Sequence, residues 1–186
     1  LIIVNALFFL ALTTPALGDF LFRFGALWPL GHPLFEPWQL VSYMFLHGSL
    51  GHIFFNLFAL WIFGQAIENF WGTKRFTVYY FLTGIGAALI HMFISGGGAP
   101  TVGSSGAVYG LLLAFGMMFP ERYIVLLIPP IPIKAKYFVA IFGAIELLSG
   151  VFRPGSGIAH FAHLGGMVVG FVLIKYWGLK GTRQEY

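Results

Sequence analysis

Ser105 and His163 are the side chains of this sequence with the clearest capacity for chemistry. Ser105 stands where a glycine-rich loop gives way to an apolar stretch, and His163 stands inside a later apolar stretch. Burying a hydroxyl or an imidazole among lipid-facing residues costs free energy, so such groups usually mark a working site. A serine and a histidine together suggest a nucleophile and its general base. The two residues therefore predict serine chemistry inside a membrane.

The acidic residues favour a dyad over a triad. No Asp stands near the predicted depth of Ser105 and His163, and Glu146 is the only carboxylate within an apolar stretch. Each residue of the pair also has a structural explanation when taken alone. An isolated serine can bond to a carbonyl one turn earlier, and a buried histidine can be satisfied by a carbonyl. Taken together, the residues favour a Ser105–His163 dyad.

The neighbours of the two residues would allow them to meet. Gly106 follows Ser105, and Gly166 follows His163 by three residues on the same helix face. Small residues on facing helices allow close backbone approach, which would bring imidazole and hydroxyl within hydrogen-bond reach. Tyr109 lies one turn beyond Ser105, where its ring is placed to pack against the imidazole.

His52 and Asn56 form a second polar pair in another apolar stretch. They are four residues apart, so they lie on one face of a helix. An imidazole N–H and a side-chain amide are both suitable donors to an oxyanion, although hydrogen bonding between helices would also explain them. Backbone N–H groups at the start of the helix that carries Ser105 add donors and the positive end of a dipole. These groups predict stabilisation of a negative charge that forms on a substrate carbonyl.

The composition shows what kind of element must place these groups. Hydrophobic residues make up 59% of the 186 residues and charged residues only 9%, with a mean hydropathy of +0.87. A soluble domain carries about 25% charged residues, so most of this chain must face lipid. The formal charge of +4 comes from scattered cations, which argues against a nucleic-acid partner. The absence of cysteine excludes disulfides and thiolate-bound zinc.

Apolar stretches punctuated by glycine, proline and charged residues run along the whole chain: 1–17, 45–64, 76–95, 105–119, 137–150 and 158–177. A helix needs about 20 residues to cross a bilayer, so the fourth and fifth stretches are short. We predict an all-α membrane protein, a bundle of six transmembrane helices in a single domain over residues 1–186. The chain starts at Leu1, and we expect it to be truncated at the N-terminus. A cleaved signal peptide over 1–17 is the alternative for the first stretch.

The cations predict how the bundle sits in the membrane. Arg23 and Arg153 fall on one side of the six-helix arrangement. The other eight cations fall on the opposite side: Lys74, Arg75, Arg122, Lys134, Lys136, Lys175, Lys180 and Arg183. Cytoplasmic loops are enriched in Lys and Arg, so both termini should be cytoplasmic. The helices that carry His52, Ser105 and His163 then all run inward, and at about 1.5 Å per residue these side chains share the outer half of the membrane.

Other functions fit the residues less well. Six histidines raise metal or haem binding, but His160 and His163 have no Glu between them in an H-E-x-x-H pattern. A haem held by two histidines would leave Ser105 unexplained. A transporter would use broken helices and intramembrane polar groups, but the chain shows no internal repeat and few charges. We therefore expect no metal and no cofactor.

Three short motifs follow the order of one known family. One motif is G-x-S-G with a Tyr four residues after the serine, another is H-x-x-x-N, which comes before it in the chain, and the last is A-H-x-x-G. They stand here as Gly103-Ser104-Ser105-Gly106 with Tyr109, as His52-Ile53-Phe54-Phe55-Asn56, and as Ala162-His163-Leu164-Gly165-Gly166. At these positions the sequence resembles the rhomboid family of intramembrane serine proteases, and the match covers nearly the whole chain.

The resemblance implies a rhomboid-like bundle with a long first loop, and it implies roles for the motif residues. Ser105 would be the nucleophile and His163 the general base and acid. The oxyanion hole would consist of His52, Asn56 and the backbone N–H of Ser105. Further motif positions would support the site: Tyr109, Gly103, Gly106 and Gly166. The implied substrates are transmembrane segments of other proteins, cut near the outer face of a bacterial inner membrane.

Two observations qualify the resemblance. Rhomboids often carry Trp-Arg in the first loop, whereas the matching pair here is Trp38-Gln39, which removes a cation that could contact lipid headgroups. The family also includes inactive relatives, so a binding or quality-control module for membrane proteins is the alternative function. Such relatives typically lack the serine or the histidine, whereas Ser105 and His163 are both present here.

Overall fold

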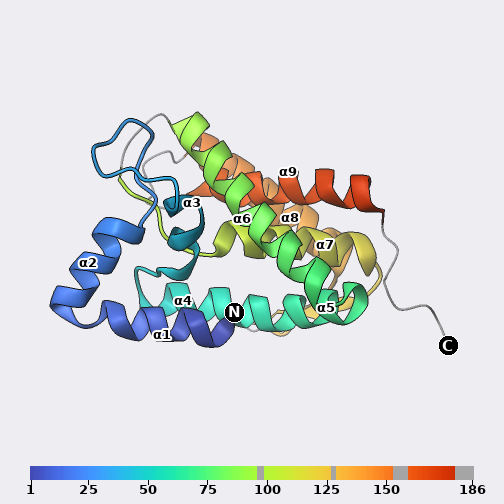
Figure 1. The fold of residues 1–186 in the computed structure, drawn as a ribbon. Coiled ribbons are helices and arrows are strands. Elements are labelled where there is room, and N and C mark those ends of the chain that lie inside the picture. Colours follow the sequence, from blue (N-terminus) through green and yellow to red (C-terminus); the bar gives the residue numbers. More distant parts are fainter. Residues whose placement is uncertain (96–98, 127–128, 153–158, 179–186) are drawn as a thin grey trace.

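The structure is a computed structural model, and it describes four stretches of the chain: 1–95, 99–126, 129–152 and 159–178. Some positions used in the sequence analysis lie outside these stretches: residues 96–98, Arg153, Lys180 and Arg183. Helices account for most of the described residues, in agreement with the predicted all-α class (Figure 1).

In chain order the helices are α1 (Ile2–Leu12), α2 (Pro15–Gly25), α3 (Gln39–Ser42), the 3-10 turn η1 (Tyr43–Phe45), α4 (Leu50–Ala59), the π-helical turn η2 (Leu60–Gly64), α5 (Gln65–Trp71), α6 (Thr73–Ser95), α7 (Ser105–Met118), α8 (Ala135–Phe152) and α9 (His160–Trp177). The longest connections between the helices are the loop before α3 and the segment between α7 and α8. A small antiparallel hairpin separates α7 from α8, and it pairs β1 (Tyr123–Val125) with β2 (Pro132–Lys134). The hairpin was not predicted.

Three helical stretches among the described residues are long and apolar enough to cross a membrane: Leu50–Trp71, Thr73–Ile94 and Ala135–Phe152. The first joins α4, η2 and α5 into one continuous helix. The helices Ile2–Leu12 and Ser105–Met118 are apolar but shorter than a full crossing. Large apolar side chains such as Phe54, Phe55 and Phe93 are exposed on the bundle, as expected for a surface that meets lipid.

The first apolar stretch differs from the prediction. It was expected as one element over 1–17, but α1 ends at Leu12 and α2 begins at Pro15. Proline lacks a backbone N–H and suits the first turn of a helix, so Pro15 starts a new helix rather than continuing the old one. Figure 1 shows α2 turning away from α1 at this point.

Helix α7 lies at the centre of the bundle. It packs against α6, α8 and α9 as well as the α4–α5 helix, and nine of its fourteen residues are buried. Its approach to α9 is close because the two helices meet at Gly106 and Gly166. A β-carbon added to Gly166 would lie only 1.8 Å from the carbonyl oxygen of Gly106. The predicted contact between small residues is therefore present, and it fixes how α7 and α9 face each other.

Gln39 fastens the long loop between α2 and α3. Its side chain is fully buried, and its amide donates to the carbonyl oxygens of Leu34 at 2.8 Å and Phe24 at 3.3 Å. Its amide oxygen accepts from the backbone N–H of Trp28 at 3.2 Å. An arginine at this position could donate but not accept, so the Gln that departs from the family pattern makes a bond that Arg cannot make.

The fastened loop also reaches the segment that leads into α7. Leu27 and Thr101 exchange two backbone hydrogen bonds, each 2.9 Å long. The side chain of Thr101 in turn bonds to His91 Nε2 at 3.0 Å, near the end of α6. These contacts hold the approach to Ser105 from both sides.

Candidate active site

Ser105 and His163 lie at the beginnings of two adjacent helices. Ser105 is the first residue of α7, and His163 lies in the first turn of α9, which begins at His160. The Oγ of Ser105 and the Nε2 of His163 are 2.8 Å apart, within hydrogen-bond distance. The hydroxyl is partly exposed, whereas the imidazole is buried. The structure thus brings together the two residues that the sequence paired.

Gly103 shapes the turn that delivers Ser105 to this position. Its φ of +120° lies in the region that favours glycine, and its N–H donates to the carbonyl oxygen of Tyr43 at 2.9 Å. A β-carbon at this position would lie 2.6 Å from Nε2 of His52 and 3.8 Å from the Ser105 hydroxyl. Two features therefore favour glycine at this position, the backbone conformation and the nearness of the His52 ring, and its supporting role stays a prediction.

His52 comes from the first turn of α4 and lies beside the same turn. The backbone N–H of Gly48 donates to His52 Nδ1 across a long 3.4 Å. In that tautomer Nδ1 is the acceptor and Nε2 carries the hydrogen, on the side that faces Gly103 and Ser105. The geometry is compatible with the predicted role of an oxyanion donor.

Asn56 lies one turn further along α4 and is buried. Its amide nitrogen donates to the carbonyl oxygen of His52 at 2.9 Å, which uses one of its two N–H groups. Its amide oxygen accepts from the hydroxyl of Ser104 at 3.2 Å. These two bonds fix the orientation of the Asn56 amide, and with it the direction of its second N–H.

Ser104 is the residue that sequence reasoning missed at this end of the site. It is fully buried, and besides Asn56 its hydroxyl lies 3.5 Å from Nε2 of His47. The sequence singled out Ser105 of the Ser-Ser pair and gave its neighbour no role. The contacts of Ser104 to His47 and Asn56 come from residues about 50 positions earlier in the chain, so only the fold shows them.

Tyr109 and Glu146 both contact the His163 imidazole, Tyr109 at the face of the ring and Glu146 at Nδ1. The Tyr109 ring stacks on the His163 ring, with centroids 4.4 Å apart and planes 7° from parallel, and its hydroxyl donates to Oε1 of Glu146. The other carboxylate oxygen of Glu146 lies 2.6 Å from Nδ1 of His160 and 3.0 Å from Nδ1 of His163. The sequence analysis identified this acid within an apolar stretch but predicted no partner for it.

The same acid and the two histidines form the group of donors best placed to share a metal among the described residues. Their ligand atoms all lie within 4.8 Å of one another. The expectation of no metal and no cofactor therefore stays a prediction.

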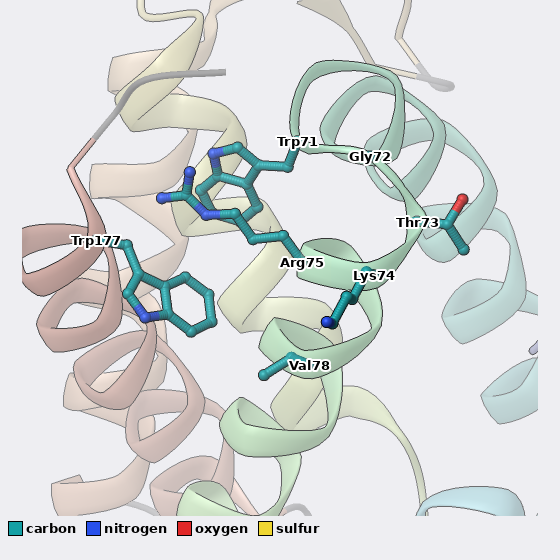
Figure 2. Close-up of a pocket in the computed structure, with 7 residues that line it drawn as sticks. All are labelled: Trp71, Gly72, Thr73, Lys74, Arg75, Val78 and Trp177. Atoms are coloured by element: carbon teal, nitrogen blue, oxygen red, sulfur yellow. The ribbon is translucent and has the colours of Figure 1, made fainter. Parts of the chain in front are cut away.

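A surface hollow lies where α6 begins and α9 ends, and none of the predicted site residues line it (Figure 2). It has a volume of about 460 Å³ and is lined by Trp71, Gly72, Thr73, Lys74, Arg75, Val78 and Trp177. The Arg75 guanidinium lies 4.7 Å from the Trp71 ring and 5.2 Å from the Trp177 ring, and it donates to the carbonyl oxygen of Gly178 at 2.7 Å. These contacts tie together the ends of α5, α6 and α9, which indicates a structural role.

The chain matches one known protein family over most of its length. The rhomboid domain matches residues 34–179, which include both members of the Ser105–His163 pair and the helices that carry them. The chain belongs to the rhomboid family. Rhomboid domains are helical membrane bundles, so this rhomboid is an integral membrane protein.

Relatives of this rhomboid come from bacteria and plants. The chain is 30% identical to the rhomboid protease GlpG of Yersinia pestis (strain Pestoides F) over 189 residues, which cover 99% of this chain and 63% of that protein. It is 30% identical to the rhomboid protease GluP of Bacillus subtilis (strain 168) over 149 residues, covering 77% of this chain and 27% of that protein. It is 35% identical to the chloroplastic Rhomboid-like protein 11 of Arabidopsis thaliana over 149 residues, which cover 75% of this chain and 52% of that protein. The chain thus spans between 27% and 63% of the length of these relatives.

Proposed function

We propose that this rhomboid is an intramembrane serine endopeptidase that cleaves transmembrane segments of other proteins. The observation that carries the proposal is the 2.8 Å approach of Ser105 Oγ to His163 Nε2 at the start of a helix in the middle of an apolar bundle. A serine hydroxyl is a weak nucleophile unless a base can take its proton. The two named relatives that are proteases, GlpG and GluP, support the same function.

The first chemical step is acylation of Ser105. Nε2 of His163 accepts the hydroxyl proton while Oγ attacks the scissile carbonyl carbon, and the carbonyl oxygen becomes an oxyanion. His163 then gives that proton to the leaving amine as the C–N bond breaks, which leaves an ester on Ser105. In the second step water attacks the ester while His163 takes a proton from it, and His163 then returns that proton to Oγ of Ser105 as the ester C–O bond breaks and the acid product leaves.

The oxyanion of both steps is held by donors around the turn that precedes α7. We assign this role to the backbone N–H of Ser105, to Nε2–H of His52 and to the remaining amide N–H of Asn56. Backbone N–H groups at a helix start have no partner within the helix, so the first is available for a substrate atom. Such donors lose little energy in reorganising because the fold already aims them.

The proposed orientation in the membrane sets the depth of the site, and the depth sets where a substrate is cut. We propose that six helices cross the membrane in one domain over residues 1–186, that both termini are cytoplasmic, and that the membrane is a bacterial inner membrane. The site then lies in the outer half of the bilayer. A helical substrate hides its carbonyls in its own hydrogen bonds, so the enzyme should favour segments that unwind easily near the outer face.

The test is cleavage of a model transmembrane substrate by the purified protein in liposomes. Wild type should cut the substrate once in the outer part of its segment, and mass spectrometry of the products gives the position. Ser105→Ala should bind the same substrate without cutting it. If wild type only retains the substrate, as the uncleaving Ser105→Ala variant does, the alternative of an inactive rhomboid-like binding or quality-control module is supported instead.

A further inference from the structure

Glu146 is an acid in an apolar helix whose role the dyad leaves unexplained. It lies in the middle of α8 and is 7% exposed. An ionised carboxylate at such a place is costly unless polar partners surround it. Three side chains do so, since Tyr109 donates to one carboxylate oxygen while His160 and His163 lie within 3.0 Å of the other.

The two nitrogens of His163 face two different groups. Nε2 lies 2.8 Å from the Ser105 hydroxyl, and Nδ1 lies 3.0 Å from Oε2 of Glu146. For Nε2 to accept the serine proton, the hydrogen of the neutral ring must be on Nδ1. A carboxylate beside Nδ1 favours that tautomer, and it favours the imidazolium that forms after proton transfer.

The contact at Nδ1 acts through charge rather than through an aligned hydrogen bond. The two atoms are at ion-pair separation, but Nδ1 of His163 makes no hydrogen bond with acceptable geometry. A Coulomb attraction depends on distance more than on direction, so the misalignment leaves it in place. The carboxylate is held at this distance by its bonds to Tyr109 and His160.

A metal ion explains the spacing less well. Tetrahedral zinc with bonds of about 2.0–2.1 Å keeps its ligand atoms about 3.3 Å apart. Oε2 of Glu146 is closer than that to both Nδ1 atoms, at 2.6 Å from His160 and 3.0 Å from His163. The spacing suits a carboxylate that accepts from one ring and attracts the other.

We propose that Glu146 is a positioning residue for the general base, so that the reaction uses a Ser105–His163–Glu146 arrangement instead of an isolated dyad. Glu146 keeps the hydrogen of the neutral ring on Nδ1 and stabilises the imidazolium of each transition state. His160 and Tyr109 hold the carboxylate in place. The inference rests on the proposed protease function, because it assigns a partner to the same base.

Glu146→Gln is the informative variant because it removes the charge and keeps the size of the side chain. We expect kcat to fall by between about 10² and 10⁴-fold, as when the acid of a soluble serine protease is neutralised or removed, with KM nearly unchanged. Glu146→Asp keeps the charge and should restore part of the lost kcat. Tyr79→Phe is the structural control, because it removes a buried bond to the Gly110 carbonyl in the same bundle, 2.8 Å long, without touching the site. It should lower the melting temperature and leave kcat within about twofold.

The measurements are steady-state cleavage in micelles, thermal unfolding, and the rate at which a fluorophosphonate labels Ser105. Glu146→Gln should slow labelling as well as cleavage. Wild-type kcat in Glu146→Gln, a change in KM alone, or a loss of kcat that Tyr79→Phe reproduces would each overturn the inference. So would loss of wild-type activity in a chelator that zinc restores.

The labelling rate separates this inference from the function beneath it. If wild type labels at Ser105 but cleaves no transmembrane substrate, the proposed proteolysis fails, and the comparison of labelling rates still decides the role of Glu146. If wild type neither labels nor cleaves, both proposals are wrong.

Discussion

Two regions of the bundle hold polar groups among apolar helices in different ways: one lies where α9 begins, and the other lies where α9 ends and α6 begins. At the N-terminal end of α9, imidazoles, hydroxyls and one carboxylate form a chain of hydrogen bonds and close contacts around His163. About 20 Å away along the same helix, the Arg75 guanidinium lies between the Trp71 and Trp177 rings (Figure 2). We call this second arrangement of Trp71, Arg75 and Trp177 the tryptophan clamp.

The difference is whether a proton can move. Nε2 of His163 faces the Ser105 hydroxyl and Nδ1 faces the Glu146 carboxylate, so the ring can take a proton on one side while a negative charge lies on the other. The guanidinium of the clamp stays charged, donates only, and meets aromatic faces and a carbonyl. Only the first arrangement sets an imidazole beside a hydroxyl, so only the first suits the proposed chemistry. We therefore expect substitutions at the first to change rates and substitutions at the second to change stability.

The largest contrast should come from the reacting pair. Ser105→Ala and His163→Ala should each reduce cleavage to the background, and the double variant should be no worse, because the two groups act as a unit. Thermal unfolding of Ser105→Ala should change little, since Ser105 is only partly buried, whereas His163→Ala also loses the stacking on Tyr109 and should unfold at a lower temperature. Cleavage of a fluorogenic transmembrane substrate measures the effect. Near wild-type turnover by Ser105→Ala would disprove the mechanism.

The next effect concerns the proposed oxyanion donors. His52→Ala and Asn56→Ala should each lower kcat by up to about 10²–10³-fold, the cost of removing one well-placed donor. A smaller loss is expected where the backbone N–H of Ser105 carries most of the charge. The kinetics must separate kcat from KM, because an increase in KM alone would show that these residues bind substrate instead.

The clamp should show the opposite behaviour. Arg75→Met removes two cation–π contacts and a bond to the Gly178 carbonyl, which should lower the free energy of unfolding by about 1–3 kcal/mol. Arg75→Lys keeps the charge but not the planar stacking, so it should recover only part of the loss. Lys74→Met removes a charge from the neighbouring residue and serves as the control. In all three variants kcat should stay close to wild type, and a large loss of kcat in Arg75→Met would break the comparison.

The smallest effect lies outside the apolar helices, in the turn between α7 and β1. The carboxylate of Glu121 accepts hydrogen bonds from Lys134, at 2.7 Å, and from Lys136. These bonds lower the pKa of Glu121 from its ordinary value of 4.5 to about 2. A lowered pKa means that the stabilisation is complete above about pH 4.5 and is lost as the pH falls toward 2. The melting temperatures of wild type and Glu121→Gln should therefore differ slightly at pH 7 and converge below pH 3. A difference that persists at low pH would contradict this.

Much of the fold was predictable because each long apolar stretch has to form a helix in lipid. The stretches expected at 76–95, 105–119, 137–150 and 158–177 match α6 to α9 within three residues at every end. The stretch at 45–64 was displaced, since its helix starts at Leu50 and runs on to Trp71. Hydropathy could not predict where this helix ends, because the helix continues past residue 64 into a stretch that contains polar residues.

The candidate site was predictable in its types of residue and not in its network. Ser105 and His163 stand out because a hydroxyl and an imidazole are rare in such stretches. Ser104 and Glu146 gain their meaning only from contacts across helices, to Asn56 and His163. No spacing along the chain encodes those contacts. The Glu146 carboxylate nevertheless gave a usable signal, since an acid in an apolar helix needs a partner.

The chain order of the site has a consequence for biosynthesis. Ser105 and His163 are 58 residues apart, and the helix that carries His163 follows every other helix described in the structure. A ribosome therefore delivers the nucleophile to the membrane well before its base. Until α9 inserts and its Gly166 meets Gly106, the His163 imidazole is not in place to accept the Ser105 proton. Under the proposed mechanism, a chain whose α9 has not yet inserted has no proteolytic activity toward the membrane proteins made beside it.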